Sequence, residues 1–219
     1  MTRKPLILGA VALSLAVFAA AAWFVTRPNQ VADTAPIAPE MAEALVRPYS
    51  PILGPQEAPV TIVEFFDPAC EACRAFYPVV KDIMAEHGDA VRVVIRYTPF
   101  HGESSEEAIR VLEAARVQGV YEPVMEALLD EQSRWASRGT PEPGLILNIA
   151  GTAGLDADAA EAQMMAPDVV GIINQDRADV ETVGVTGTPT FFVNGKPLEP
   201  FGADQLRALV AAEVAQSAT

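Results

Sequence analysis

The sequence contains little cysteine, histidine or positive charge, and each shortage excludes a class of function. It holds only 2 Cys, 2 His and 2 Trp among its 219 residues. The 15 Lys and Arg stand against 29 Asp and Glu, so the formal net charge is -14. This balance argues against nucleic-acid binding, because phosphate recognition needs a basic surface. The chain also lacks an internal repeat, a glycine-rich phosphate loop and a Gly-x-Ser-x-Gly motif, which argues against solenoids, nucleotide binding and serine-hydrolase chemistry.

The longest uncharged apolar run lies at the N-terminus. Residues Leu6 to Val25 carry no charge, and as a helix rising about 1.5 Å per residue they would span roughly 30 Å, the thickness of a bilayer core. Arg3 and Lys4 precede the run and only Arg27 follows closely, so the start should stay in the cytoplasm and the rest should be exported. We expect residues 1–27 to be a transmembrane signal anchor, with a cleaved signal peptide as the alternative.

The next segment is rich in proline. Seven Pro residues fall within residues 28–59, which predicts a semi-extended linker between the membrane and a folded domain. One or two helical turns are compatible with the sequence from Glu40 to Val46. The apolar half of the composition and the remaining length fit one domain of ordinary size.

The domain begins with a strand followed by a helix. Val60 to Phe66 is β-branched and aromatic, which predicts a buried strand, and Glu64 is its one acidic residue. Asp67-Pro68-Ala69 ends the strand, and Cys70 opens a helix with Cys73 one turn further on. Apolar residues then recur at offsets of three and four, so Cys73 is expected to face the core and Cys70 to lie outside this stripe. The stripe comprises Cys73, Phe76, Tyr77, Val80, Ile83 and Met84.

The two sulfurs are therefore expected to differ in chemistry. At a helix N-terminus the dipole and the unpaired backbone N–H groups favour a thiolate. Cys-x-x-Cys spacing at a helix start lowers the pKa of a free thiol from about 8.5 to between roughly 3.5 and 7.5. Cys70 is predicted to be an exposed nucleophile that attacks a disulfide, and Cys73 the hidden thiol that resolves the mixed disulfide. Glu64 is predicted to be buried with a raised pKa and to act as the base for Cys73.

Other interpretations of the cysteine pair remain open at this point. A structural disulfide would close a very short loop and would stabilise the fold little. A closed zinc site would also need His87 and His101, whose spacing does not fit a zinc finger; His101 is interpreted as a surface residue after the second strand. Cu(I) bound by the two thiolates is the alternative that competes with redox chemistry.

Two separate motifs resemble the thioredoxin superfamily. The stretch from Glu64 to Cys73 is similar to its active site, with a buried acid six residues before the first Cys, and Pro78 matches its helix-kinking proline. The stretch from Gly187 to Lys196 is similar to the loop that leads through a cis proline into a hairpin. Pro189 would be this cis proline, facing Cys70. The resemblance implies that the backbone of Thr188 pairs with an extended substrate chain and that its hydroxyl can hydrogen-bond the Cys70 sulfur.

The long helical stretch between these motifs resembles the inserted domain of DsbA-type oxidoreductases. The implied fold is α/β: thioredoxin halves at residues 60–99 and 184–219, a helical domain at 100–183, and the N-terminal anchor or signal segment before them. The sequence departs from DsbA in carrying Glu71-Ala72 between the cysteines instead of Pro-His. The negative charge of Glu71 raises the pKa of the neighbouring Cys70, whereas the helix N-terminus lowers it by a comparable or larger amount. We therefore expect a Cys70 pKa below that of free Cys and a less oxidising pair than in DsbA.

The resemblance implies an exported thiol–disulfide oxidoreductase without cofactor or bound metal. Its clients would be unfolded or reduced exported proteins, and a DsbB-like or DsbD-like membrane protein would reset the cysteine pair. The expected location is the bacterial inner membrane with the catalytic domain in the periplasm, or the periplasm itself if the N-terminal segment is cleaved. The direction of electron flow does not follow from the sequence. A Cu(I) chaperone that binds through Cys70 and Cys73 is the alternative function.

Overall fold

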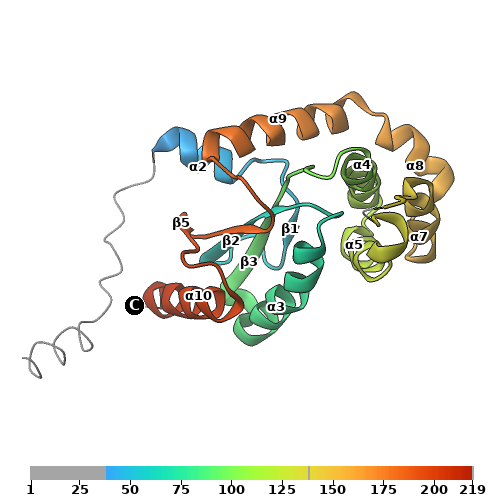
Figure 1. The fold of residues 1–219 in the computed structure, drawn as a ribbon. Coiled ribbons are helices and arrows are strands. Elements are labelled where there is room, and N and C mark those ends of the chain that lie inside the picture. Colours follow the sequence, from blue (N-terminus) through green and yellow to red (C-terminus); the bar gives the residue numbers. More distant parts are fainter. Residues whose placement is uncertain (1–37, 138, 219) are drawn as a thin grey trace, which may run out of the picture. The chain divides into compact units, whose positions relative to one another are not determined.

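The computed structural model describes residues 38–137 and 139–218, and its fold is shown in Figure 1. The predicted anchor at residues 1–27 lies outside these residues. Within the described part of the chain, no helix has the length and apolar character needed to cross a membrane.

A five-stranded sheet forms the centre of the domain, in the order β1-β3-β2-β4-β5. The central strands β2 (Val60–Phe66) and β3 (Val91–Tyr97) run parallel, with Val60 opposite Val91 and Phe66 opposite Tyr97. The outer strands β1 (Ile52–Leu53), β4 (Thr190–Val193) and β5 (Lys196–Pro197) each pair antiparallel with their neighbours. Strands β2 and β3 are almost continuously buried, as their β-branched runs predict.

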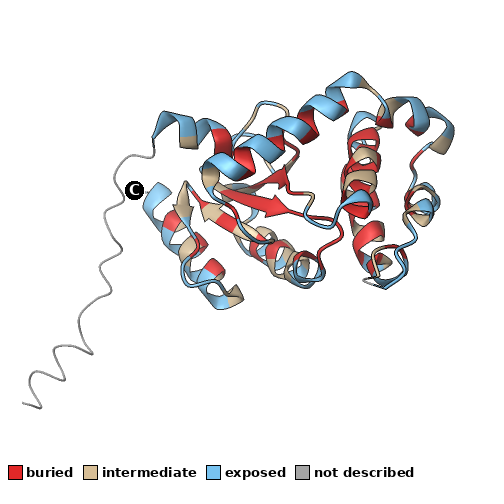
Figure 2. Cartoon of the chain, turned by 45° about the horizontal axis from the view of Figure 1, so that its top comes forward, coloured by how far each residue is buried: buried red, intermediate tan, exposed pale blue. Residues whose placement is uncertain are grey.

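Helices cover both faces of this sheet. Helices α3 (Glu71–His87) and α10 (Ala203–Ser217) pack together on one face, and a 3-10 turn (Gly88–Ala90) leads from α3 into β3. On the other face α9 (Pro167–Val183) packs on β3 and on α2 (Pro39–Leu45). Figure 2 shows buried residues concentrated in the strands and on the inward sides of these helices.

The segment between β3 and β4 is helical, in agreement with the sequence. Its helices α4, α5, α7 and α8 pack on one another beside the sheet (Figure 1). Helix α9 was expected to belong wholly to this insertion, but it continues back over the sheet, because its buried residues also cover β3 and α2. The remaining elements are α4 (Glu103–Val117), α5 (Tyr121–Asp130), α6 (Gln132–Trp135), a 3-10 turn (Pro143–Leu145), α7 (Ile146–Thr152) and α8 (Ala157–Met164).

The folded domain starts earlier than the sequence predicts. Residues 39–53 fall within the expected linker 28–59, yet they form α2 and β1. Ala44 and Leu45 are buried, and the Arg47 guanidinium binds both carboxylate oxygens of Asp179 on α9 at 2.9 and 2.7 Å. These elements are too short for a recognisable period, so their packing partners far along the chain determine them.

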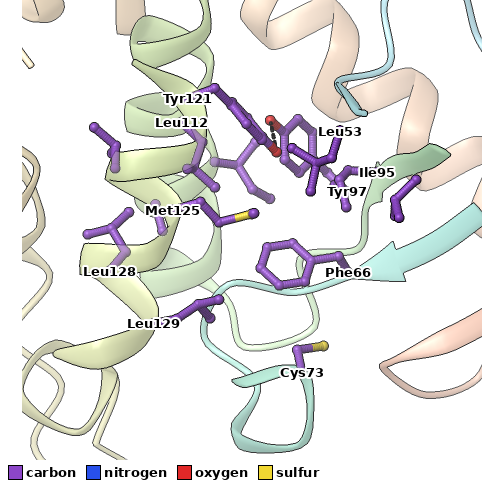
Figure 3. Close-up of a cluster of buried hydrophobic side chains, with 14 of the residues drawn as sticks. Leu53, Phe66, Cys73, Ile95, Tyr97, Leu112, Tyr121, Met125, Leu128 and Leu129 are labelled. Atoms are coloured by element: carbon purple, nitrogen blue, oxygen red, sulfur yellow. Dashed lines mark hydrogen bonds between the residues drawn. The ribbon is translucent and has the colours of Figure 1, made fainter. Parts of the chain in front are cut away.

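One large apolar cluster joins the sheet to the inserted helices. Figure 3 shows Phe66 of β2 and Cys73 of α3 in the same cluster as Met125 and Leu129 of α5. The hydroxyl groups of Tyr97 and Tyr121, 3.2 Å apart, cross the same boundary. The inserted domain is therefore packed directly against the elements that carry the cysteines.

Candidate active site

The two cysteines lie where β2 passes into α3. Cys70 is the N-cap residue, with extended backbone angles (φ -81°, ψ 123°), and its carbonyl accepts the Arg74 amide as the first bond of the helix. Cys73 lies one turn into α3 and is fully buried. The two cysteines are not joined by a disulfide in this structure. The strand, the turn and the helix start therefore place the two residues as the sequence predicts.

The predicted exposure of Cys70 is wrong. Its relative exposure is 8%, against 0% for Cys73. The reason is the loop before β4, which covers the helix start: the Cys70 thiol donates a hydrogen bond to the Thr188 carbonyl at 3.3 Å. The two thiols still differ in accessibility, but by a small margin, and the larger difference between them is electrostatic.

Hydrogen bonds stabilise the thiolate of Cys70. They lower its pKa to about 5, with the Cys73 thiol as the largest contributor, followed by the Thr188 side chain and the backbone N–H groups of Cys73 and Ala72. Partial burial opposes this effect. The direction agrees with the sequence prediction, and at neutral pH the sulfur is ionised.

The surroundings of Cys73 have the opposite effect. Burial raises the pKa of Cys73 far above its ordinary value, and the nearby Cys70 and Glu64 raise it further. The backbone N–H of Asp67 donates to the Cys73 sulfur at 3.5 Å but compensates only in part. Cys73 therefore keeps its proton unless a base removes it.

Glu64 is the buried acid that the sequence predicts. It lies in the middle of β2 and is 2% exposed. Burial, together with the charge of Cys70, raises its pKa to about 8. The carboxyl group is thus mostly protonated at neutral pH; once ionised, its negative charge raises the pKa of Cys73. It has the properties required to exchange a proton with the buried thiol.

The loop before β4 has the predicted geometry. The peptide bond between Thr188 and Pro189 is cis, and the Thr188 carbonyl contacts the Cys70 thiol. A cavity of about 430 Å³ lies beside this loop; the strands β4 and β5 and the exposed ring of Phe201 contribute to its lining. The structure thus brings together Glu64, Cys70, Cys73, Thr188 and Pro189.

Asp67 and His101 also belong to the site, although neither was expected there from the sequence. The buried Asp67 carboxylate accepts the Ala69 amide at 2.9 Å and the Phe100 amide at 2.8 Å, and it pairs with His101 Nδ1 at 2.7 Å. Asp67 thus ties the turn before Cys70 to the loop after β3. The only signal in the sequence was an acidic residue in a turn, which normally indicates local capping.

Gln132 of α6 is the second residue that sequence reasoning missed. Its side-chain amide nitrogen donates to the carbonyl oxygens of Pro68 at 2.7 Å and of Cys70 at 3.0 Å. The residue is 1% exposed. The inserted domain therefore contacts the backbone of the cysteine turn directly through a polar side chain.

A metal site is not supported elsewhere in the described residues. No group of three or more His, Cys, Asp or Glu side chains within residues 38–137 and 139–218 has the geometry to hold a metal ion. The Nδ1 atom of His101 is bonded to Asp67.

Comparisons with known proteins agree with this geometry. The family model described as thioredoxin matches residues 47–212. A thioredoxin-like oxidoreductase from Silicibacter pomeroyi DSS-3 is 34% identical, covers 81% of this chain and 98% of its own, and has a TM-score of 0.68. The structure of alpha-DsbA1 from Wolbachia pipientis is 17% identical and covers 82% of this chain and 98% of its own, with a TM-score of 0.71, which shows similarity of fold.

The curated relatives are much longer proteins. The Na(+)/H(+) antiporter NhaA of Herminiimonas arsenicoxydans is 32% identical over 147 residues, which are 67% of this chain and 22% of that protein. The chain thus spans about a quarter of the length of the curated relatives that it matches. The antiporter activity in their names belongs to those longer proteins.

Proposed function

Because the chain belongs to the thioredoxin family, we propose that it is a DsbA-like enzyme that exchanges thiols and disulfides in exported proteins. The observation that carries the proposal is the contrast between two sulfurs three positions apart. Hydrogen bonds lower the pKa of Cys70 to about 5, whereas burial raises that of Cys73. One sulfur is a stable thiolate at neutral pH, and the other holds a proton in the core.

As an oxidant, the enzyme would act through its Cys70–Cys73 disulfide. A client thiolate attacks the Cys70 sulfur, the internal disulfide breaks, and Cys73 leaves and takes up a proton. A second client thiolate then attacks the client sulfur of the mixed disulfide, and Cys70 leaves as a thiolate. The client loses two electrons and gains a disulfide, and the enzyme ends as the dithiol. Reduction of a client disulfide runs these steps in reverse. Isomerisation begins with the same attack by Cys70 and ends when another client thiolate displaces Cys70, with no net transfer of electrons.

Glu64 would carry the proton that Cys73 gives up or takes up. With a pKa of about 8, the carboxyl group is protonated at neutral pH and can supply the departing Cys73. In the reverse direction the carboxylate accepts the Cys73 proton before that sulfur attacks the mixed disulfide. Glu64 acts on a buried partner that water reaches poorly.

Thr188 and Pro189 would bind the client. The backbone before the cis proline lies against the Cys70 sulfur, where an extended polypeptide can pair with it in the manner of an added strand. The adjoining cavity, with Phe201 at its rim, supplies apolar surface for the client's side chains. Such a site recognises extended chains rather than one sequence.

The proposed setting is the periplasmic side of the bacterial inner membrane. The support is the uncharged run from Leu6 to Val25 and the positive charges before it; cleavage of this segment would leave a soluble periplasmic enzyme. A DsbB-like membrane quinone reductase would remove electrons from an oxidant. A DsbD-like reductant would supply them to an isomerase or reductase.

The test is trapping of the mixed disulfide, combined with assays in both directions. We expect the wild-type protein to refold reduced ribonuclease or to reduce insulin. Cys73→Ser should accumulate a covalent complex with a client through Cys70, because the resolving thiol is missing. Cys70→Ser is the matched control and should trap none. Equal trapping by both variants would contradict the distinct roles of the two cysteines, and sub-nanomolar Cu(I) binding by a wild-type protein inert in both assays would favour the Cu(I) chaperone instead.

A further inference from the structure

The turn that carries Cys70 is held from outside by a side chain of the inserted domain. The Gln132 amide nitrogen donates one hydrogen to the Pro68 carbonyl and the other to the Cys70 carbonyl, at 2.7 and 3.0 Å. These carbonyls belong to the peptide groups on either side of the Ala69–Cys70 bond. We propose that Gln132 is a positioning residue for the exchange reaction, and that it holds these peptide groups so that the N-terminus of α3 faces the Cys70 sulfur. The inference rests on the proposed function.

Gln132 is itself held rigidly. It begins the short helix α6 (Gln132–Trp135), whose Trp135 is fully buried. The Trp135 indole N–H donates to the Leu128 carbonyl at 2.8 Å, and the Ala136 amide donates to the Gln132 carbonyl at 2.8 Å. Helix α5 and the apolar cluster therefore fix the position from which the amide reaches the turn.

The orientation of the amide is determined by its neighbours. Both of its partners are carbonyl oxygens, which only accept hydrogen bonds, so the nitrogen must face them. The Gln132 Oε1 atom is consequently buried, and among the described residues it has no hydrogen-bond partner. An unpaired buried acceptor is destabilising. The fold thus leaves one buried oxygen of Gln132 unpaired while both N–H donors of the same side chain bond the cysteine turn.

The geometry links the two donors to the sulfur. The N–H groups of Ala72 and Cys73 lower the pKa of Cys70. These groups lie in the first turn of α3, and the Cys70 carbonyl that Gln132 bonds begins the same turn, so its orientation affects where the N–H groups point. Without Gln132, the Cys70 carbonyl keeps the Arg74 amide at 3.2 Å, but the Pro68 carbonyl loses the partner described here. The negative ends of both carbonyl dipoles would then be less compensated near the sulfur, which disfavours a thiolate.

The experiment compares Gln132→Met with Gln118→Met in the full-length protein. Methionine matches the length of glutamine and removes both donors. Gln118 is a matched control because its amide also bonds a backbone carbonyl in the inserted domain, that of Asp156, away from the cysteines. We expect Gln132→Met to raise the Cys70 pKa, measured by thiolate absorbance, by about one unit. The equilibrium with glutathione should shift about tenfold toward the protein disulfide, and Gln118→Met should change neither.

A purely structural role would lower the melting temperature without moving the pKa or the glutathione equilibrium, and that result in a folded Gln132→Met would overturn the proposal. Gln132→Glu preserves the shape and should shift the pKa in the same direction, so it serves if Gln132→Met does not fold. Loss of folding in both variants would assign Gln132 to stability and would also count against the proposal. A wild-type protein without exchange activity would instead contradict the proposed function.

Discussion

At Cys70 hydrogen bonds lower the pKa of the thiol, whereas at Cys73 burial raises it. The pKa of about 5 for Cys70 lies between values of about 7 for thioredoxin and about 3.5 for DsbA. A stable thiolate is a good leaving group and favours the reduced state of the pair. That the pair is less oxidising than DsbA stays a prediction, which its reduction potential in a glutathione buffer would test.

Glu64→Gln tests the proton carrier. Burial and the charge of Cys70 raise the pKa of Glu64 to about 8, so the fraction of carboxylate able to accept the Cys73 proton rises with pH through this value. We expect the variant to resolve a mixed disulfide with glutathione roughly a hundredfold more slowly than wild type. Its rate should also lack the inflection near pH 8. Stopped-flow kinetics across about two pH units on each side measures both effects.

Glu86→Gln provides the control, since Glu86 is exposed on α3, the same helix that carries Cys73. It should leave the rate and its pH dependence unchanged. If Glu64→Gln kept the wild-type profile, another group would have to carry the proton.

At the scale of elements, the parts that the sequence predicted are local. The strand–turn–helix around Cys70 and the loop at Pro189 are each encoded within a dozen or so neighbouring residues, by β-branched runs, helical periodicity and turn residues. Gln132 and His101 escaped prediction because their partners are far along the chain and their own segments show no period. The exposure of Cys70 was wrong although its contact with Thr188 was expected, because helical periodicity alone does not show how far a loop 118 positions away covers the thiol.

The contact between β3 and α9 rests on a buried ion network. Arg96 is fully buried and binds Asp176 at 2.7 Å and Asp179 at 2.6 Å. Arg96→Met should lower the free energy of unfolding by about 3–5 kcal/mol, because it leaves the buried Asp176 carboxylate without a cation, whereas Asp179 keeps Arg47. Urea denaturation measures the loss. Arg177→Met, at the exposed pair with Glu106, should cost less than about 1 kcal/mol; equal losses would show that burial of the network has no energetic consequence.

Over the whole molecule, segments outside both predicted thioredoxin halves make buried polar contacts that hold the described domain together. Arg47 bonds Asp179, and Tyr49 donates to Asp176 at 2.7 Å, so the stretch after α2 completes the ion network on α9. The cysteine turn itself is bonded by Gln132 of the inserted helices and, through Asp67, by the Phe100 amide in the loop after β3. The contact of the Cys70 sulfur with the Thr188 carbonyl adds a third part of the chain that holds the redox turn.

The stability of the whole domain should depend on pH differently in its two redox states. In the folded dithiol the Cys70 pKa is about 5 instead of 9.0. The unfolded chain therefore holds a proton that the folded one has lost, and the reduced protein gains stability as pH rises from about 5 to 9. Glu64 acts oppositely. Its pKa of about 8 in the dithiol means that stability falls as pH rises from about 4.5 to 8. Burial, the larger cause of this raised pKa, persists in the disulfide, so the oxidised protein should lose stability with rising pH in the same direction.

The difference in free energy of unfolding between the two redox states isolates the contribution of Cys70, because only the reduced protein has its thiol. We expect the free energy of unfolding of the reduced protein, minus that of the oxidised protein, to rise with pH by at most about 1.4 kcal/mol per unit between about 5 and 9. Urea denaturation of both forms over this range measures it. Glu64→Gln should remove the loss of stability with rising pH from the unfolding free energy of each redox state. The difference between the two states should stay nearly unchanged, since the buried Glu64 contributes to both. A difference that stays flat across the window would mean that the folded structure does not stabilise the Cys70 thiolate, and the distinction between the two sulfurs would then be steric alone.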